Sequence, residues 1–304
     1  MTITRPIPFP KHRGFTLAEL MVAMGITAII LTLLVTITGV ALDGWRVSRN
    51  KVRTARQAKA ALEQMSRDFE SMVVRSGNNF EWLFAESETS APGPSGNESP
   101  NAARLIFFTA ATDRYDGDIG GANDEGGDVS AVGYKLLYGE PMAEMREGPY
   151  SVFALYRQLV NPNDAFEDML SSEDLENAYS SFENSESESS NFVCENIYQM
   201  SVVFLVEYTQ EVGGRLERNQ VRIPVLSAGG GREAVNWFKM KGNGIQVQGD
   251  ANPKYGRGRV VAVDLSASVM TDGAVARLRQ GTATDQYINR NTNPYMKTVL
   301  LPQP

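Results

Sequence analysis

The chain has 304 residues, enough to bury the core of one large domain or two small ones. Its formal net charge of −7 disfavours nucleic acid as a partner, because nucleic-acid-binding surfaces are usually basic. The only cysteine is Cys194 and the only histidine is His12, so no intrachain disulfide and no Cys/His zinc site can form. A Ser/His/Asp or Cys/His catalytic set is nearly excluded for the same reason, and we predict no cofactor and no enzymatic activity.

The first strong feature is an apolar segment of 28 residues, 15–42, in which Glu19 is the only ionisable side chain. As a helix it would span roughly 40 Å at about 1.5 Å per residue, which is enough to cross a bilayer. The apolar part of a secretory signal peptide is shorter, about 7–15 residues, and ends at a small-residue cleavage site. This segment instead leads into Asp43-Gly44-Trp45. The sequence therefore predicts a transmembrane helix over residues 15–42.

Charges on the two sides of this segment give conflicting indications of its orientation. Lys11 and Arg13 precede it and suit a cytoplasmic N-terminus. Six basic residues follow it between positions 46 and 59, and a plain count of positive flanks points the other way. The charge count alone leaves the orientation open.

The order of residues is more informative than the count. Basic residues, then Gly14, then Phe15-Thr16-Leu17-Ala18-Glu19 and an unbroken apolar run resemble the leader of type IV pilins and type II secretion pseudopilins. The resemblance implies a leader, residues 1–14, that a prepilin peptidase removes between Gly14 and Phe15 before the new amine of Phe15 is methylated. It also implies other pilin or pseudopilin subunits and an inner-membrane assembly platform as partners. The protein would be a single-pass inner-membrane protein with a cytoplasmic N-terminus and a periplasmic or filament-borne C-terminal domain.

Glu19 would become the fifth residue of the processed chain. An acid inside a membrane is costly unless it is partnered, so Glu19 is a candidate functional residue. The resemblance supplies the partner, the amine of Phe15 on a neighbouring subunit, which would align two helices during assembly. The alternative is an unpartnered acid that reaches the membrane surface from the start of the helix.

The helix is expected to continue beyond the membrane over residues 43–78. Positions 45–76 contain neither Gly nor Pro. Apolar residues recur there at the spacing of one helix face: Leu62, Met65, Phe69, Met72 and Val73. We expect this face to pack on a sheet and the helix to stop at Gly77-Asn78-Asn79.

Residues 79–304 read as a β-rich domain. Short runs rich in β-branched and aromatic residues predict strands over 103–110, 129–138, 151–160, 198–209, 220–226, 258–269 and 295–300, with a short helix over 272–280. A long helix followed by an antiparallel meander, without βαβ alternation, predicts an α+β fold with the helix packed on the sheet. The pilin resemblance implies the same arrangement.

Three polar segments, 86–100, 113–128 and 161–190, are expected to be mobile loops. The last holds nine acidic residues and no basic one. The second contains carboxylates among glycines, which is a composition that Ca²⁺ favours: Asp113, Asp116, Asp118, Asp124 and Asp128. Their spacing does not match an EF-hand loop, so we predict a solvated loop and no metal site.

These features favour a structural subunit, a minor pseudopilin or pilin-like protein. The helix extension and later strands also resemble J-type minor pseudopilins and the prepilin-like cassette proteins of verrucomicrobial genomes. The alternatives are an adhesive or ligand-binding minor pilin displayed on the surface and, less favoured, a membrane-anchored envelope enzyme.

Overall fold

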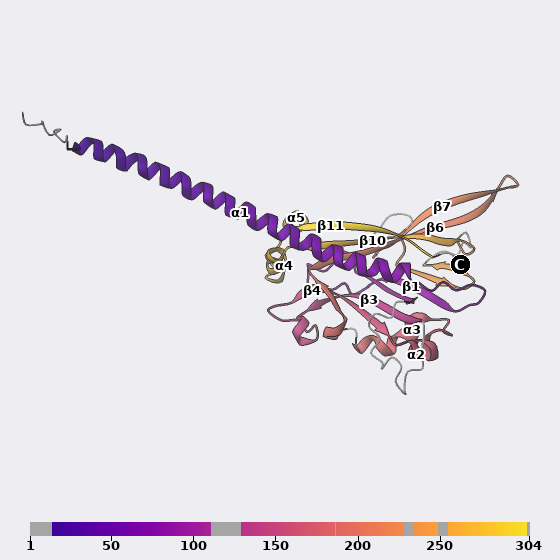
Figure 1. Cartoon of the computed structure of the whole chain (residues 1–304). Coiled ribbons are helices and arrows are strands. Elements are labelled where there is room, and N and C mark those ends of the chain that lie inside the picture. Colours follow the sequence, from indigo (N-terminus) through magenta and orange to yellow (C-terminus); the bar gives the residue numbers. More distant parts are fainter. Residues whose placement is uncertain (1–13, 111–128, 186, 228–233, 249–254, 303–304) are drawn as a thin grey trace, which may run out of the picture. The chain divides into compact units, whose positions relative to one another are not determined.

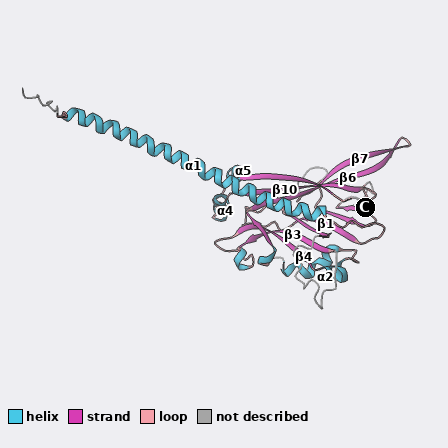
Figure 2. Cartoon of the chain, viewed as in Figure 1, coloured by secondary structure: helices cyan, strands magenta, loops and turns pink. Residues whose placement is uncertain are grey.

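The computed structural model describes residues 14–110, 129–185, 187–227, 234–248 and 255–302. The chain divides into two compact units, Met1–Asn50 and Lys51–Pro304. A single helix of 54 residues, α1 (Leu17–Glu70), passes from the first unit into the second, and the strands all belong to the second (Figures 1 and 2).

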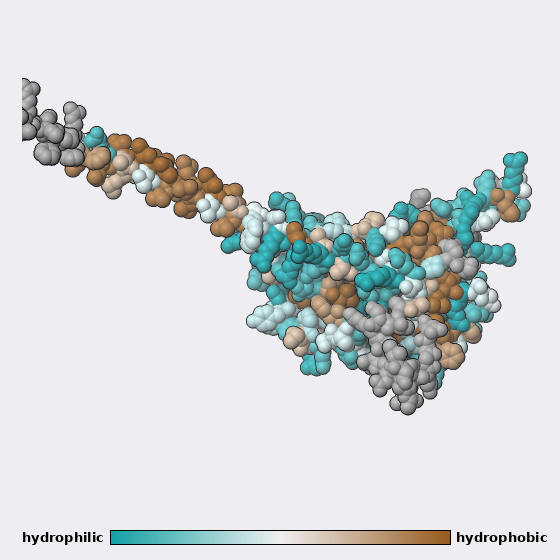
Figure 3. All heavy atoms as spheres, in the orientation of Figure 1, coloured by the Kyte–Doolittle hydropathy of each residue, from teal (hydrophilic) through white to brown (hydrophobic). Residues whose placement is uncertain are grey.

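The part of α1 in the first unit exposes every side chain. Figure 3 shows its surface as an almost continuous hydrophobic band. Three of its hydroxyl groups are satisfied within the helix, since Thr27, Thr32 and Thr36 each donate to the carbonyl oxygen four residues earlier, at 2.8–2.9 Å. Such back-bonding pairs these three hydroxyl donors within the helix, which suits a helix surrounded by lipid.

The part of α1 in the second unit packs on the domain through the predicted face. Leu62, Met65 and Phe69 are buried, and the ring of Phe69 stacks on Phe107 of the sheet with ring centroids 4.3 Å apart. Burial of each such side chain contributes about 1.5–3 kcal/mol. The expected packing of this helix face on a sheet is therefore confirmed.

The predicted end of α1, at residue 78, is wrong by eight residues. The helix ends at Glu70, and the chain then runs alongside strand β2 (Ala103–Thr109), where Val73 N donates to Phe108 O at 2.9 Å and Ala110 N donates to Ser71 O at 2.9 Å. Two consecutive β-branched residues, Val73 and Val74, favour this extended conformation over a last helical turn. Gly77 marks the turn that follows.

The strands form two antiparallel sheets. One has seven strands in the order β5-β4-β3-β2-β1-β8-β9, and the other has four in the order β11-β10-β6-β7. Besides β2, the strands are β1 (Glu81–Ser87), β3 (Ser130–Gly139), β4 (Val152–Val160), β5 (Phe192–Glu195), β6 (Ile197–Val212), β7 (Arg215–Val225), β8 (Trp237–Lys241), β9 (Gly244–Val247), β10 (Arg259–Met270) and β11 (Thr292–Leu300). The α+β class with a helix on antiparallel sheets is confirmed, and the architecture is pilin-like.

Seven of these strands and helix α4 (Asp272–Arg279) lie where the sequence predicts them. Four strands, β1, β5, β8 and β9, and helix α5 (Asp285–Asn291) were not predicted. Strands β5 and β9 have only four residues each, and β1 is buried on both faces, so none of the three shows a clear alternation of apolar and polar residues.

The acidic segment 161–190 is not the mobile loop that its composition predicts. It forms short helical turns: α2 (Pro162–Asp164), η2 (Ala165–Met169), α3 (Leu175–Tyr179), η3 (Ser180–Ser185) and η4 (Ser189–Asn191). Leu175 and Tyr179 are completely buried and join the hydrophobic core. The segment is therefore a packed part of the domain.

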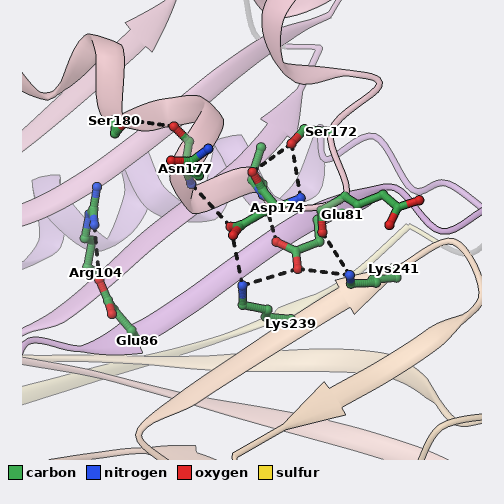
Figure 4. Close-up of polar contacts among 11 residues, drawn as sticks. Glu81, Glu86, Arg104, Ser172, Asp174, Asn177, Ser180, Lys239 and Lys241 are labelled. Atoms are coloured by element: carbon green, nitrogen blue, oxygen red, sulfur yellow. Dashed lines mark hydrogen bonds and ion pairs between the residues drawn. The ribbon is translucent and has the colours of Figure 1, made fainter.

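Basic side chains of the sheet explain why this segment is fixed (Figure 4). Glu81 on β1 is buried, accepts a hydrogen bond from Leu175 N at 2.8 Å, and lies 3.3 Å from Lys239 Nζ and 3.4 Å from Lys241 Nζ. Lys239 is also 3.6 Å from Asp174, the residue that caps α3. The positive charge that the segment lacks in its own sequence is thus supplied by a neighbouring strand.

Of the other two predicted loops, only 86–100 can be compared with the structure. In the predicted loop 86–100, Glu86 and Ser87 belong to strand β1, which is a correction to the prediction. Residues 88–100 form bends and turns without regular structure, as expected of a polar Pro/Gly/Ser segment. The whole of segment 113–128 lies outside the described residues.

Candidate processing and assembly site

The start of α1 is closed by a reciprocal pair of hydrogen bonds between Thr16 and Glu19. Thr16 is the residue before the helix, and its Oγ1 accepts from Glu19 N at 3.2 Å. In return, Glu19 Oε2 accepts from Thr16 N at 2.9 Å and from Thr16 Oγ1 at 3.0 Å. This T-x-x-E arrangement is a capping box, which satisfies two backbone N–H groups that a helix start leaves without partners.

The residues of the predicted cleavage site lie outside the helix. Gly14 and Phe15 have no regular secondary structure, and Phe15 is 90% exposed. A Cβ atom built on Gly14 would meet nothing within 4 Å, so the fold of this chain does not require glycine there. A requirement for glycine at this position would have to come from a protein that binds the segment.

Glu19 is compensated within its own chain in two ways. Its carboxylate accepts the hydrogen bonds from Thr16, and it lies at the positive end of the helix dipole, where an anion is favoured. Thr16 N belongs to the residue directly after Phe15, so the carboxylate lies one residue from the amine that cleavage would create. Among the described residues, the hydrogen bonds of the Glu19 side chain go to Thr16.

The role of Thr16 was missed in the prediction from sequence. The signal was present, since a Thr followed three residues later by Glu at the start of an apolar run is a recognised helix-start pattern. The structure adds that the carboxylate of Glu19 closes the helix through Thr16, two residues after Gly14.

Several predicted residues cannot be located. Lys11 and Arg13 of the leader lie outside the described residues, as do Asp113, Asp116, Asp118, Asp124 and Asp128 of the loop considered for Ca²⁺. Among the residues that are described, no group of three or more His, Cys, Asp or Glu side chains is placed to hold a metal ion.

Comparison with known families agrees with this geometry. Residues 9–35 match the family model of the prokaryotic N-terminal methylation motif. The chain carries a prepilin-type N-terminus. The motif implies processing by prepilin peptidase, and it covers Gly14, Phe15 and Glu19 together with most of the apolar segment.

The remaining comparisons add no relatives. No curated protein and no solved structure matches the chain. In the described residues, α1 is the one helix that is long and apolar enough to cross a membrane. The prepilin-type motif and this helix are consistent with a membrane-anchored, pilin-like protein.

Proposed function

We propose that the protein is a structural subunit, a minor pseudopilin or pilin-like protein, that a prepilin peptidase cuts between Gly14 and Phe15. After methylation of Phe15, the subunit is incorporated through α1 into a type II secretion or type IV pilus-like filament. The leader, residues 1–14, stays on the cytoplasmic side of the inner membrane, and the domain after α1 lies in the periplasm or in the filament.

The observation that carries the proposal is the methylation motif at residues 9–35, together with the apolar part of α1 before Lys51, in which every side chain is exposed. A helix that is apolar on all sides is stable in lipid or against other apolar helices but not in water. A pilin-like subunit meets both environments, lipid while it is an integral membrane protein and other apolar helices once it is part of a filament.

Glu19 gives the assembly step its specificity. Both described hydrogen bonds to its carboxylate end on Oε2. A carboxylate has about four acceptor sites, so Glu19 can accept the methylated amine of Phe15 from a neighbouring subunit without opening its capping box. In surroundings of low dielectric constant such a pair is much stronger than in water. It would set the axial position of one helix against the next.

The processing step is tested by expressing the full chain with and without a prepilin peptidase and measuring its intact mass and N-terminal sequence. The expected product begins at N-methyl-Phe15. Replacement of Gly14 by Val should block cleavage without changing the fold, because nothing in the chain packs against that position. A chain that keeps Met1 in the presence of the peptidase would contradict the proposal.

A further inference from the structure

A pocket of about 220 Å³ lies within the Lys51–Pro304 unit. It is bounded by the chain just after α1, by the β8–β9 hairpin and by residues 256–260 and 301–302. Met72, Trp82, Met240 and Leu301 form its apolar wall, and each has only 3–6% of its surface exposed. The wall is therefore part of the packed domain and is present before any ligand binds.

The polar side of the pocket is positively charged. Among the described residues that line it, four are basic, Arg75, Lys241, Arg257 and Arg259, and none is Asp or Glu. This composition is opposite to that of the whole chain, in which 36 acidic residues outnumber 29 basic ones. Clefts lined by one sign of charge attract ligands of the other sign.

Some of these charges are neutralised from outside the pocket, and others are not. Lys241 Nζ lies 3.4 Å from Glu81, and Arg259 Nη2 lies 2.7 Å from Glu207. Arg257, in contrast, is exposed and has neither a hydrogen bond nor an ion pair within the described part of the chain. It is the side chain best placed to meet an anion that enters.

Two further donors lack an anionic partner. Arg75 donates to the carbonyl oxygen of Leu170 and pairs with no carboxylate among the described residues. The indole Nε1–H of Trp82 is buried and finds no acceptor in the described part of the chain. Because this nitrogen has almost no exposed surface, it is not a donor that a ligand in the pocket can reach, and the arginines are the donors that remain.

We propose that this pocket binds a carboxylate carried on a single apolar group of about the size of a phenyl ring. An apolar cavity of about 150 Å³ is enough to hold benzene, so this volume suits one ring together with its carboxylate. The apolar group packs against the buried wall, and the carboxylate is held by charge-assisted hydrogen bonds, with Arg257 as the main contributor. This site is independent of processing and assembly through α1.

The same chemistry occurs in small aromatic acids and at the C-terminal residue of a peptide that ends in an aromatic side chain. The two sources can be distinguished by titrating phenylacetate and an acetylated dipeptide that ends in phenylalanine. Tighter binding of the dipeptide identifies a peptide C-terminus, and equal or weaker binding identifies a small organic acid.

The experiment is isothermal titration calorimetry on the full chain in phosphatidylcholine nanodiscs, with empty nanodiscs as the blank. We expect saturable binding of phenylacetate and binding at least about tenfold weaker for phenylacetamide, which lacks the charge. Arg257→Gln should weaken binding by about tenfold. Arg290→Gln, an exposed arginine that does not line the pocket, should leave it unchanged.

No saturable binding of either acid, equal affinity for acid and amide, or an unchanged affinity in Arg257→Gln would each overturn the proposal.

Discussion

Arg157 on β4 donates two parallel hydrogen bonds to Asp68 in the last turn of α1, and both side chains are completely buried. The distances are 2.7 Å from Nε to Oδ2 and 2.8 Å from Nη2 to Oδ1. Tyr134 on β3 donates its hydroxyl to the same carboxylate. Burial, and then the nearby charge of Asp68, raises the pKa of Tyr134 well above its usual value, so the phenol keeps its proton. One carboxylate thus joins the helix to two strands.

Removal of this carboxylate should strongly destabilise the domain. Asp68→Ala leaves Arg157 buried without its counter-charge, and we expect a loss of about 3–5 kcal/mol in the free energy of unfolding. Denaturant unfolding followed by circular dichroism measures it. In the double variant Asp68→Leu/Arg157→Met no buried charge is left unpaired, and most of the loss should be recovered. A loss below about 1 kcal/mol for Asp68→Ala would contradict the role assigned to the pair.

The sequence predicts one half of this arrangement and not the other. The spacing of Leu62, Met65 and Phe69 defines the buried helix face, and Asp68 lies on that face because it follows Met65 by three residues. Its partner Arg157 is 89 residues away in the sequence. The sequence pattern around Arg157 predicts a strand but does not indicate which residue Arg157 contacts. Local periodicity determines which side of an element is buried, but it contains no information on which distant charge lies opposite.

The acidic segment was predicted wrongly for the same physical reason. Judged from composition alone, the nine acidic residues of segment 161–190 are expected to repel one another and to keep the segment mobile. Lys239 and Lys241 lie on a strand that was not predicted, so their contact with Glu81 and the segment could not be anticipated. The residues of the N-terminal site, in contrast, lie close together in the sequence: Gly14, Phe15, Thr16 and Glu19. A local sequence pattern is therefore sufficient to find them.

The two roles of Glu19 can be separated by one isosteric substitution. Glu19→Gln keeps a side-chain oxygen for the capping box, in which Gln is also accepted, but removes the charge. We expect normal cleavage and a loss of at least about tenfold in co-purification with partner subunits, since the pair with the Phe15 amine needs the charge. Glu19→Ala should show the same loss.

The matched control for this experiment is Thr16→Val, which removes the capping hydroxyl and retains the carboxylate. It should be cleaved and should co-purify nearly as the unmodified chain does. Normal co-purification of Glu19→Gln would show that the charge is not used in assembly, and the pairing hypothesis would then be abandoned.

The contact between Glu81 and α3 should control how often the acidic segment detaches from the sheet. Glu81→Leu removes the acceptor for Leu175 N and leaves Lys239 and Lys241 without this carboxylate. A hydrogen bond to a charged group contributes about 1.5–3 kcal/mol, so amide hydrogen exchange at Leu175 should accelerate by about 10- to 150-fold. The control Glu167→Gln changes an exposed acid of the same segment and should leave exchange unaltered. Unchanged exchange in Glu81→Leu would mean that burial of Leu175 and Tyr179 alone holds the segment.

Glu207 on β6 should make the stability of the domain depend on acid pH. Hydrogen bonds from Arg218 and then Arg259 lower the pKa of this carboxyl from 4.5 to about 2. Because the pKa is lower in the folded state than in the unfolded state, the stabilising contribution is complete above about pH 4.5 and is lost as the pH falls from there towards about 2. The folded state should therefore lose stability in this window.

The measurement is the midpoint of thermal unfolding between pH 5 and pH 2, recorded for Glu207→Gln and for the unmodified chain. Gln cannot be titrated, so the variant should be less stable at pH 5 and should lose less stability as the pH falls. Glu217→Gln alters an exposed glutamate on the paired strand β7 and should follow the unmodified chain at every pH. If Glu207→Gln and the unmodified chain keep the same separation from pH 5 to pH 2, the two arginines do not hold the charge of Glu207 in the folded protein.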